Sequence, residues 1–213
     1  VGSFALDANT TASNNTAVGY AALGANTTAT GGTALGNQAL EANTTGNYNT
    51  AIGMQSLESN QTGTDNVAVG YYAMQANLAS NNTAVGRRSL AANTTGTQNT
   101  AVGNNALDAN TTASYNTAVG ADAGGKITTG TQNVFVGRSA GKEATVVNDV
   151  VAIGDRAGDG NTGSQNTFIG GRAGSSGGNG GGTMNIGIGF FSLYATGTST
   201  ASYNTAIGAY SME

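Results

Sequence analysis

The sequence predicts an all-β repeat solenoid or β-roll, in which the chain winds through stacked coils of about 17 residues. The closing glycines of the repeats follow one another in most copies at a step of 17 residues, with 16 twice and 19 in the last two steps. No repeat offers apolar residues at helical spacing over ten or more positions. The stretch Asn-Thr-Ala-Val/Ile-Gly is the unit that recurs, at 15–19, 49–53, 82–86, 99–103, 116–120 and 204–208.

The composition favours ordered repeats over a mixed globular core. Among 213 residues there are 35 glycines and no Pro, Cys, Trp or His, and only 6% are aromatic. Disorder would normally come with a high net charge and no period. Here the formal net charge is −4 and the period is regular, so we expect a folded chain.

Each coil is expected to hold two short strands, because β-branched runs bounded by Gly, Asn and Thr are typical of strands and turns. The residue before the closing glycine is always Val, Ile or Leu, as at Val18, Ile52 and Val102, and we expect this column to be buried. Three residues after the glycine the side chain is always Ala or Ser. Small residues let a second backbone approach closely, so this column predicts side-by-side packing of chains, most simply as a homotrimer. A single-chain solenoid is the alternative.

Asparagine forms two further columns. One opens the motif, as at Asn49, Asn99 and Asn116, and the other lies seven residues past the glycine. Asn accepts turn conformations, and stacked amides can hydrogen-bond from one coil to the next. The columns therefore predict structural amide ladders.

The chain is expected to form one repeat domain over residues 1–213, whose coils change character along its length. Regular G-x-x-A-L-x-A-N-T-T coils cover 1–120, and coils containing Phe135, Phe168 and several arginines cover 120–174. A Gly-rich bulge follows at 175–182, and longer terminal coils cover 183–213.

The residue types argue against an enzyme. Without His or Cys, the commonest nucleophile–base pairs, zinc sites and redox sites are excluded. Asp155 and Asp159 form the closest acidic pair of the charged segment, but they lie in a G-D-x-x-G-D-G turn, where solvated Asp is the ordinary case. We expect no catalytic residue, no cofactor and no metal.

A candidate ligand surface is formed by Arg138, Arg156 and Arg172 with Tyr71 and Tyr72, all one or two positions after a closing glycine. Arg binds carboxylates and phosphates, so the partner expected here is a surface polysaccharide or another host receptor. The alternative is a solvated edge with salt links to neighbouring Asp. The mild acidity speaks against nucleic acid, and no apolar run is long enough for membrane insertion.

The Thr-Thr doublets, whose first Thr lies eight residues past the glycine, raise a second function. Flat ranks of Thr on a β-solenoid are how many ice-binding proteins present a regular face. In a doublet, however, the two side chains would point to opposite sides of a strand. An ice-binding solenoid is therefore the alternative function.

The N-T-A-V/I-G motif, followed by G-x-x-A/S-L, resembles repeats of phage tail-fibre and tail-spike shafts. It is also similar to the repeats of trimeric autotransporter adhesin heads, whose repeat is shorter. The resemblance covers nearly the whole chain and implies a trimeric β-roll on a virion or cell surface, with no catalytic residue. It predicts a fibre or shaft segment of a virion tail fibre or host-attachment adhesin, located extracellularly. A self-assembling extracellular filament is a third alternative.

Overall fold

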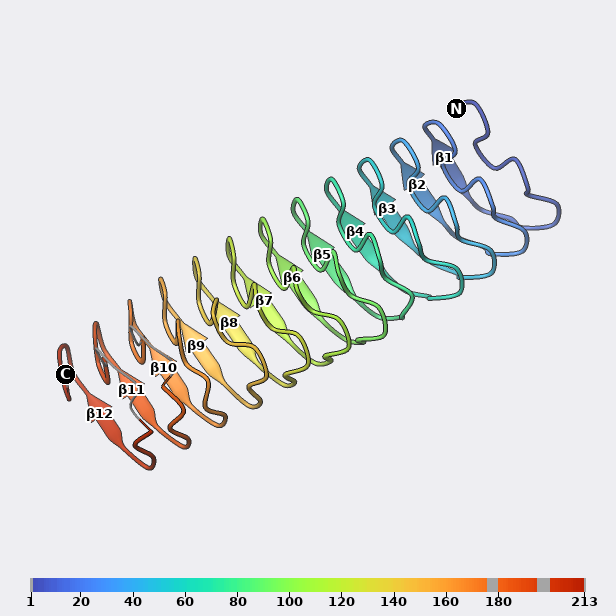
Figure 1. The fold of residues 1–213 in the computed structure, drawn as a ribbon. Coiled ribbons are helices and arrows are strands. Elements are labelled where there is room, and N and C mark those ends of the chain that lie inside the picture. Colours follow the sequence, from blue (N-terminus) through green and yellow to red (C-terminus); the bar gives the residue numbers. More distant parts are fainter. Residues whose placement is uncertain (1, 176–179, 195–199, 213) are drawn as a thin grey trace.

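The computed structural model describes residues 2–175, 180–194 and 200–212, and in them the chain forms a parallel β-solenoid (Figure 1). Each coil contributes one strand of three residues, joined to the next by turns. The predicted all-β solenoid with about 17 residues per coil is confirmed. The strands are β1 (Thr16–Val18), β2 (Thr33–Leu35), β3 (Thr50–Ile52), β4 (Val67–Val69), β5 (Thr83–Val85), β6 (Thr100–Val102), β7 (Thr117–Val119), β8 (Val134–Val136), β9 (Val151–Ile153), β10 (Thr167–Ile169), β11 (Ile186–Ile188) and β12 (Thr205–Ile207).

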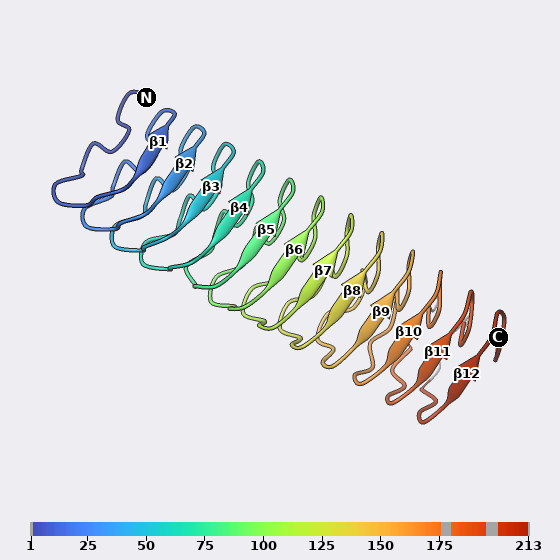
Figure 2. The ribbon, with the colours of Figure 1, turned by 180° about the vertical axis from the view of Figure 1, so that it is seen from behind.

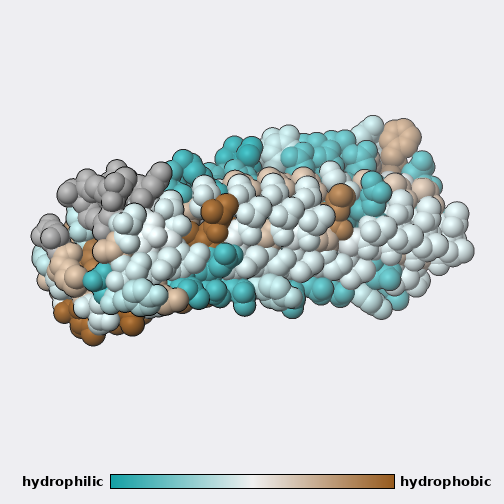
Figure 3. All heavy atoms as spheres, turned by 60° about the horizontal axis from the view of Figure 1, so that its bottom comes forward, coloured by the Kyte–Doolittle hydropathy of each residue, from teal (hydrophilic) through white to brown (hydrophobic). Residues whose placement is uncertain are grey.

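The strands form one parallel sheet in sequence order, β1 to β12. Equivalent residues pair in register, so that Thr33 of β2 faces Thr16 on one side and Thr50 on the other. Seen from either side, the coils stack into a rod with the two termini at opposite ends (Figures 1 and 2). At about 4.8 Å per coil, the twelve strands span roughly 53 Å. Figure 3 shows rows of similar hydropathy along the rod, because equivalent positions stack on one another.

The described part of each coil has one strand where the sequence analysis expected two, because left-handed residues interrupt the rest of the coil. In the coil that follows β3 the residues with positive φ include Gln55 (54°), Leu57 (49°) and Asp65 (57°), and the same three positions recur along the chain. Such residues cost conformational energy when they are not glycine. Coil-to-coil bonding offsets this cost: the Gln55 N–H donates to Asn37 O at 2.9 Å, and the Leu57 N–H donates to Ala73 O at 3.0 Å.

The interior of a regular coil is narrow, and two of its buried positions are apolar in every regular coil. One is the central residue of the strand, such as Ala101, and the other is the Leu or Met four positions after the closing glycine, such as Leu107. Both are fully buried. The Ala or Ser just before that Leu, such as Ala106, is also fully buried, inside its own coil.

In two of the four variant coils, those of β8 and β10, a larger ring replaces these side chains, while the coils of β7 and β9 keep Ala at the strand centre and have Gly124 and Gly158 in place of Leu. Phe135 and Phe168 occupy the strand centre of β8 and β10, while Gly141 and Gly174 take the place of Leu in the same two coils. A Cβ built on Gly141 would fall on the Phe135 ring, and one on Gly174 would fall on the Phe168 ring. The two exchanges, Ala to Phe and Leu to Gly, therefore compensate one another in volume. Of the Gly-rich bulge predicted at 175–182, residues 176–179 lie outside the described residues.

Asparagine side chains form a buried ladder beside the strands. The Asn99 side-chain amide donates to Asn82 Oδ1 at 3.2 Å and to Ala113 O at 2.8 Å. Its own Oδ1 accepts the Asn116 N–H at 3.0 Å, and the same arrangement links Asn49 to Asn66. A second ladder joins Asn93 and Asn110, whose side chains lie 2.8 Å apart. These bonds satisfy buried polar groups that three-residue strands leave unpaired.

We expect Asn99→Val to lower the free energy of unfolding by about 1–3 kcal/mol, because it leaves the Asn116 N–H without its acceptor and removes one of the two side-chain amides that donate to the Ala113 carbonyl. Val fits the column sterically, since Val150 occupies it immediately before β9 and still donates its N–H to Asn133 Oδ1 at 3.0 Å. Urea unfolding followed by circular dichroism measures the change. The exposed control Thr95→Ala should shift stability by less than about 0.5 kcal/mol. Equal shifts in the two variants would show that the ladder is not stabilising.

Candidate functional site

The outer face of the sheet carries a continuous row of aliphatic side chains. In each strand the middle residue points into the coil, so the first and third residues point outward. The third residue is exposed by 42% at Val18, 37% at Ile52 and 38% at Val119. We call this column the aliphatic ladder: Val18, Leu35, Ile52, Val69, Val85, Val102, Val119, Val136, Ile153, Ile169, Ile188 and Ile207.

The aliphatic ladder corrects two expectations. The sequence analysis placed Val18, Ile52 and Val102 in the core, whereas the first two are exposed and Val102 is half-buried. It also assigned the Ala/Ser column to an interface between chains, whereas Ala22, Ala106 and Ser89 are fully buried inside their own coils. The reason is the narrow interior, which accepts Ala at the strand centre and directs the β-branched residues outward.

The ladder is large for an exposed apolar feature. From the exposed fractions it presents about 800 Å² of apolar surface, against ~300–600 Å² for the largest patch on a typical monomer. Specific protein–protein interfaces bury about 800 Å² on each partner. The outer face of the sheet is therefore the surface of this rod that most needs covering.

The Thr doublets lie elsewhere and already use their first hydroxyl. The Thr27 hydroxyl donates to Thr44 O at 3.1 Å, and the Thr94 hydroxyl donates to Thr111 O at 3.0 Å. Thr44, Thr111 and Thr128 repeat this bond to the following coil. The first Thr of these doublets therefore links one coil to the next.

A second surface lies at the turn that follows each strand. We call the positions one and two residues after the closing glycines the arginine edge, because all five arginines of the chain lie there. Seven of the thirteen Phe and Tyr residues share these positions. The arginines are Arg87, Arg88, Arg138, Arg156 and Arg172, and the aromatic residues are Phe4, Tyr20, Tyr71, Tyr72, Phe190, Phe191 and Tyr210.

Only part of this positive charge is neutralised within the chain. Arg88 pairs with Asp108 at 3.2 Å and Arg138 with Asp155 at 2.8 Å. Over the described ranges, Arg87, Arg156 and Arg172 have no carboxylate oxygen within 4.0 Å. The Arg172 guanidinium lies instead over the Phe191 ring, 5.2 Å from its centroid.

The predicted ligand residues all lie on the arginine edge, but they do not form one cluster. Tyr71 and Tyr72 follow β4, and their ring centroids lie 3.9 Å apart. The neighbouring Tyr71 hydroxyl raises the pKa of the Tyr72 phenol. Arg138 follows β8, four strands further along the rod, and Arg156 and Arg172 follow β9 and β10. The closer neighbours of the tyrosines are Arg87 and Arg88, after β5.

The two members of the acidic pair, Asp155 and Asp159, lie in different surroundings. Partial burial raises the pKa of the Asp159 carboxyl, while Asp155 is committed to its ion pair with Arg138. Among the described residues no three His, Cys, Asp or Glu side chains come together as metal ligands do. That part of the chain also holds no helix long and apolar enough to cross a membrane.

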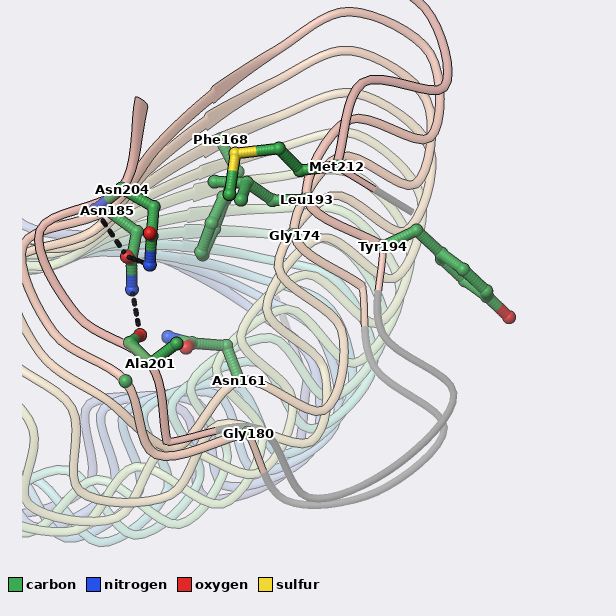
Figure 4. Close-up of a pocket in the computed structure, with 11 residues that line it drawn as sticks. Asn161, Phe168, Gly174, Gly180, Asn185, Leu193, Tyr194, Ala201, Asn204 and Met212 are labelled. Carbon is green, nitrogen blue, oxygen red and sulfur yellow. Dashed lines mark hydrogen bonds between the residues drawn. The ribbon is translucent and has the colours of Figure 1, made fainter. Parts of the chain in front are cut away.

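A cavity of about 170 Å³ lies in the last coils. Phe168, Leu193 and Met212 point toward one another on one side, and Asn185 and Asn204 lie on the other, joined by a hydrogen bond of 3.0 Å (Figure 4). Tyr194 points away from it. The cavity continues the interior of the solenoid, where Gly187 replaces the Ala or Phe of other strands.

Comparisons of the chain with protein-family models, with curated proteins and with solved structures find no match.

Proposed function

We propose that this chain is a structural segment of a fibre or shaft, belonging to a virion tail fibre or a host-attachment adhesin, and that it works as a homotrimer outside the cell. The observation that carries the proposal is the aliphatic ladder, which runs along all twelve strands. Its role is mechanical: stacked coils form a rod roughly 53 Å long that holds a receptor-binding part away from the particle.

The partner that fits the ladder best is another copy of the same chain. A second copy presents an equally flat face with the same spacing of about 4.8 Å between side chains. In a cyclic trimer the ladder of each copy, about 800 Å², is shared between two neighbours, and burying all three ladders removes about 2,400 Å² of apolar surface from water. Cyclic packing around the rod axis keeps equal ends together, as a shaft requires. The number three comes from the resemblance of the repeats to trimeric fibres and adhesin heads.

The test is the solution mass by light scattering behind a sizing column, over a dilution series. We expect the mass of three chains, stable to dilution, and a monomer for the double variant Val85→Lys/Val119→Lys. Both positions lie on the ladder and are exposed, so circular dichroism should not change. The control Gln98→Lys places one charge on an exposed turn between them and should leave the mass unaltered.

A wild-type monomer, or a double variant that keeps the mass of three chains, would overturn the assembly through this face.

Ice binding is the second candidate, and the outward Thr of the strands favours it. Eight of the twelve strands begin with Thr, on the same face as the ladder: Thr16, Thr33, Thr50, Thr83, Thr100, Thr117, Thr167 and Thr205. In this Thr-x-Val/Ile pattern both side chains point to the same face of the sheet, whereas the two side chains of a Thr doublet would point to opposite sides of a strand. If the chain is monomeric, shaping of ice crystals by the wild type but not by Val85→Lys/Val119→Lys would select this function.

A further inference from the structure

The arginine edge is not explained by the scaffold. Other coils place Asn37, Asn104 or Ala121 one residue after the glycine, and Gln55 or Ser139 two residues after it. Their backbones follow the same path, with positive φ at the second position. The coil therefore requires neither Arg nor an aromatic ring here, although every arginine of the chain is found at these positions.

The first concentration of these side chains lies after β4 and β5. Tyr71 is 37% exposed and its ring packs against that of Tyr72. The backbone holds the next coil in place, since the Arg88 N–H donates to Tyr71 O at 2.9 Å. Arg87 is exposed one coil away, about 4.8 Å along the rod, with no carboxylate at ion-pair distance in the described residues. Tyr71 and Arg87 thus occupy the same position of the arginine edge in neighbouring coils.

The second concentration lies after β10 to β12. Phe191 stacks on Tyr210 with centroids 5.6 Å apart and planes 6° from parallel. Phe190 meets Tyr210 edge to face at 5.7 Å and is 49% exposed. Arg172 completes the group over Phe191.

The chemistry of both groups fits a sugar that bears a carboxylate. An aromatic face packs against the apolar C–H face of a pyranose ring, and a guanidinium binds a carboxylate through two parallel hydrogen bonds. Nucleic acid fits less well. Duplex DNA carries one phosphate charge per ~1.7 Å of its length. The carboxylates of Asp122 and Asp155 lie between the arginines of this edge, so they would repel such closely spaced phosphates.

We propose that the arginine edge binds an extended acidic polysaccharide, with the Tyr71/Arg87 group and the Arg172/Phe190 group as its two contact points. The centres of the two groups lie six strands apart, about 29 Å along the rod, so the ligand is a polymer rather than a single sugar. This inference deepens the attachment role proposed above and rests on it, because a shaft alone needs no ligand.

The test uses biolayer interferometry on the whole chain, with polygalacturonate and hyaluronate as acidic polymers and dextran as the neutral one. We expect binding to at least one acidic polymer, none to dextran, and a loss of about tenfold in Tyr71→Asn/Arg87→Asn. Asn occupies the Arg87 position in neighbouring coils, as at Asn104, so the fold tolerates the change. Acidic trisaccharides, which reach only one group, should bind more weakly than the polymer.

The matched control is Tyr115→Asn, which removes an exposed ring from the turn before β7, where Asn14 and Asn81 stand in other coils. It should bind as the wild type does. The proposal is overturned if neither acidic polymer binds, if dextran or duplex DNA binds as tightly, or if the control loses as much as the double variant. Light scattering on the same samples reports self-association separately. A wild-type chain that forms the trimer but binds neither acidic polymer contradicts the ligand proposal and leaves the proposed shaft intact.

Discussion

Phe135→Ala is expected to lower the free energy of unfolding by about 3–5 kcal/mol, and adding Gly141→Leu to the same chain is expected to restore more than half of that loss. The fully buried Phe135 ring fills space that Leu takes in the regular coils. Removing the ring alone leaves a cavity between β7 and β9. Leu at 141 refills it in the way that Leu107 does beside Ala101.

The backbone at position 141 already suits Leu. Gly141 has φ of 59°, and the Leu residues at this position of regular coils, such as Leu57 and Leu107, have φ of 49° and 50°. Gly141→Leu alone should nevertheless be strongly destabilising, because its Cβ would fall on the Phe135 ring. Each single substitution should therefore lower the free energy of unfolding strongly, and the double variant should lower it much less. Urea unfolding of the three variants measures the coupling, and additive losses would contradict the exchange of volume.

Gly103→Ala is expected to be among the most damaging single substitutions in the chain, with a loss above about 3 kcal/mol. Gly103 has φ of 139°, where residues with a side chain are strained. A Cβ there would also lie 2.6 Å from the carbonyl carbon of Gly120 in the next coil. Backbone cannot turn aside as a flexible side chain can, so the two coils would have to separate.

The matched control for this substitution is Gly208→Ala. Gly208 has φ of 123°, but a Cβ there meets nothing within 4 Å. The control carries the backbone strain without the collision, so we expect a loss of about 1–2 kcal/mol. Thermal unfolding followed by circular dichroism compares the two. Equal losses would mean that the conformation of the closing glycines, and not the closeness of the coils, makes them necessary.

The 17-residue period, the solenoid architecture and the ladders of Asn side chains could be predicted from the sequence. Because equivalent positions of a solenoid must stack, the spacing of Asn82, Asn99 and Asn116 already aligned them in one column. The same reasoning aligned the arginines on one edge. The contacts between rings, such as Phe191 on Tyr210, depend on side-chain directions in the turns, which spacing does not determine.

Hydrophobicity did not show which residues of each strand face the interior of the coil. In Thr100-Ala101-Val102 the larger apolar residue would ordinarily be taken as the buried one. With only three residues, alternation fits either side, and a shift of one residue exchanges the two faces. The width of the coil decides between them. Leu107 fills most of the interior and leaves room only for Ala101, so Val102 points outward.

The in-register stacking also determines how such a rod can evolve in length. Duplication or deletion of one 17-residue unit in the regular segment joins coils with the same contacts, so the rod grows or shortens by about 4.8 Å at a time. Between β7 and β10 the segment that can be duplicated or deleted without changing the contacts is two coils long. Strands centred on Ala118, Phe135, Ala152 and Phe168 alternate small and large, and loss of the Ala152 coil would bring the two rings together. Viable length variants in that segment should therefore differ by two coils.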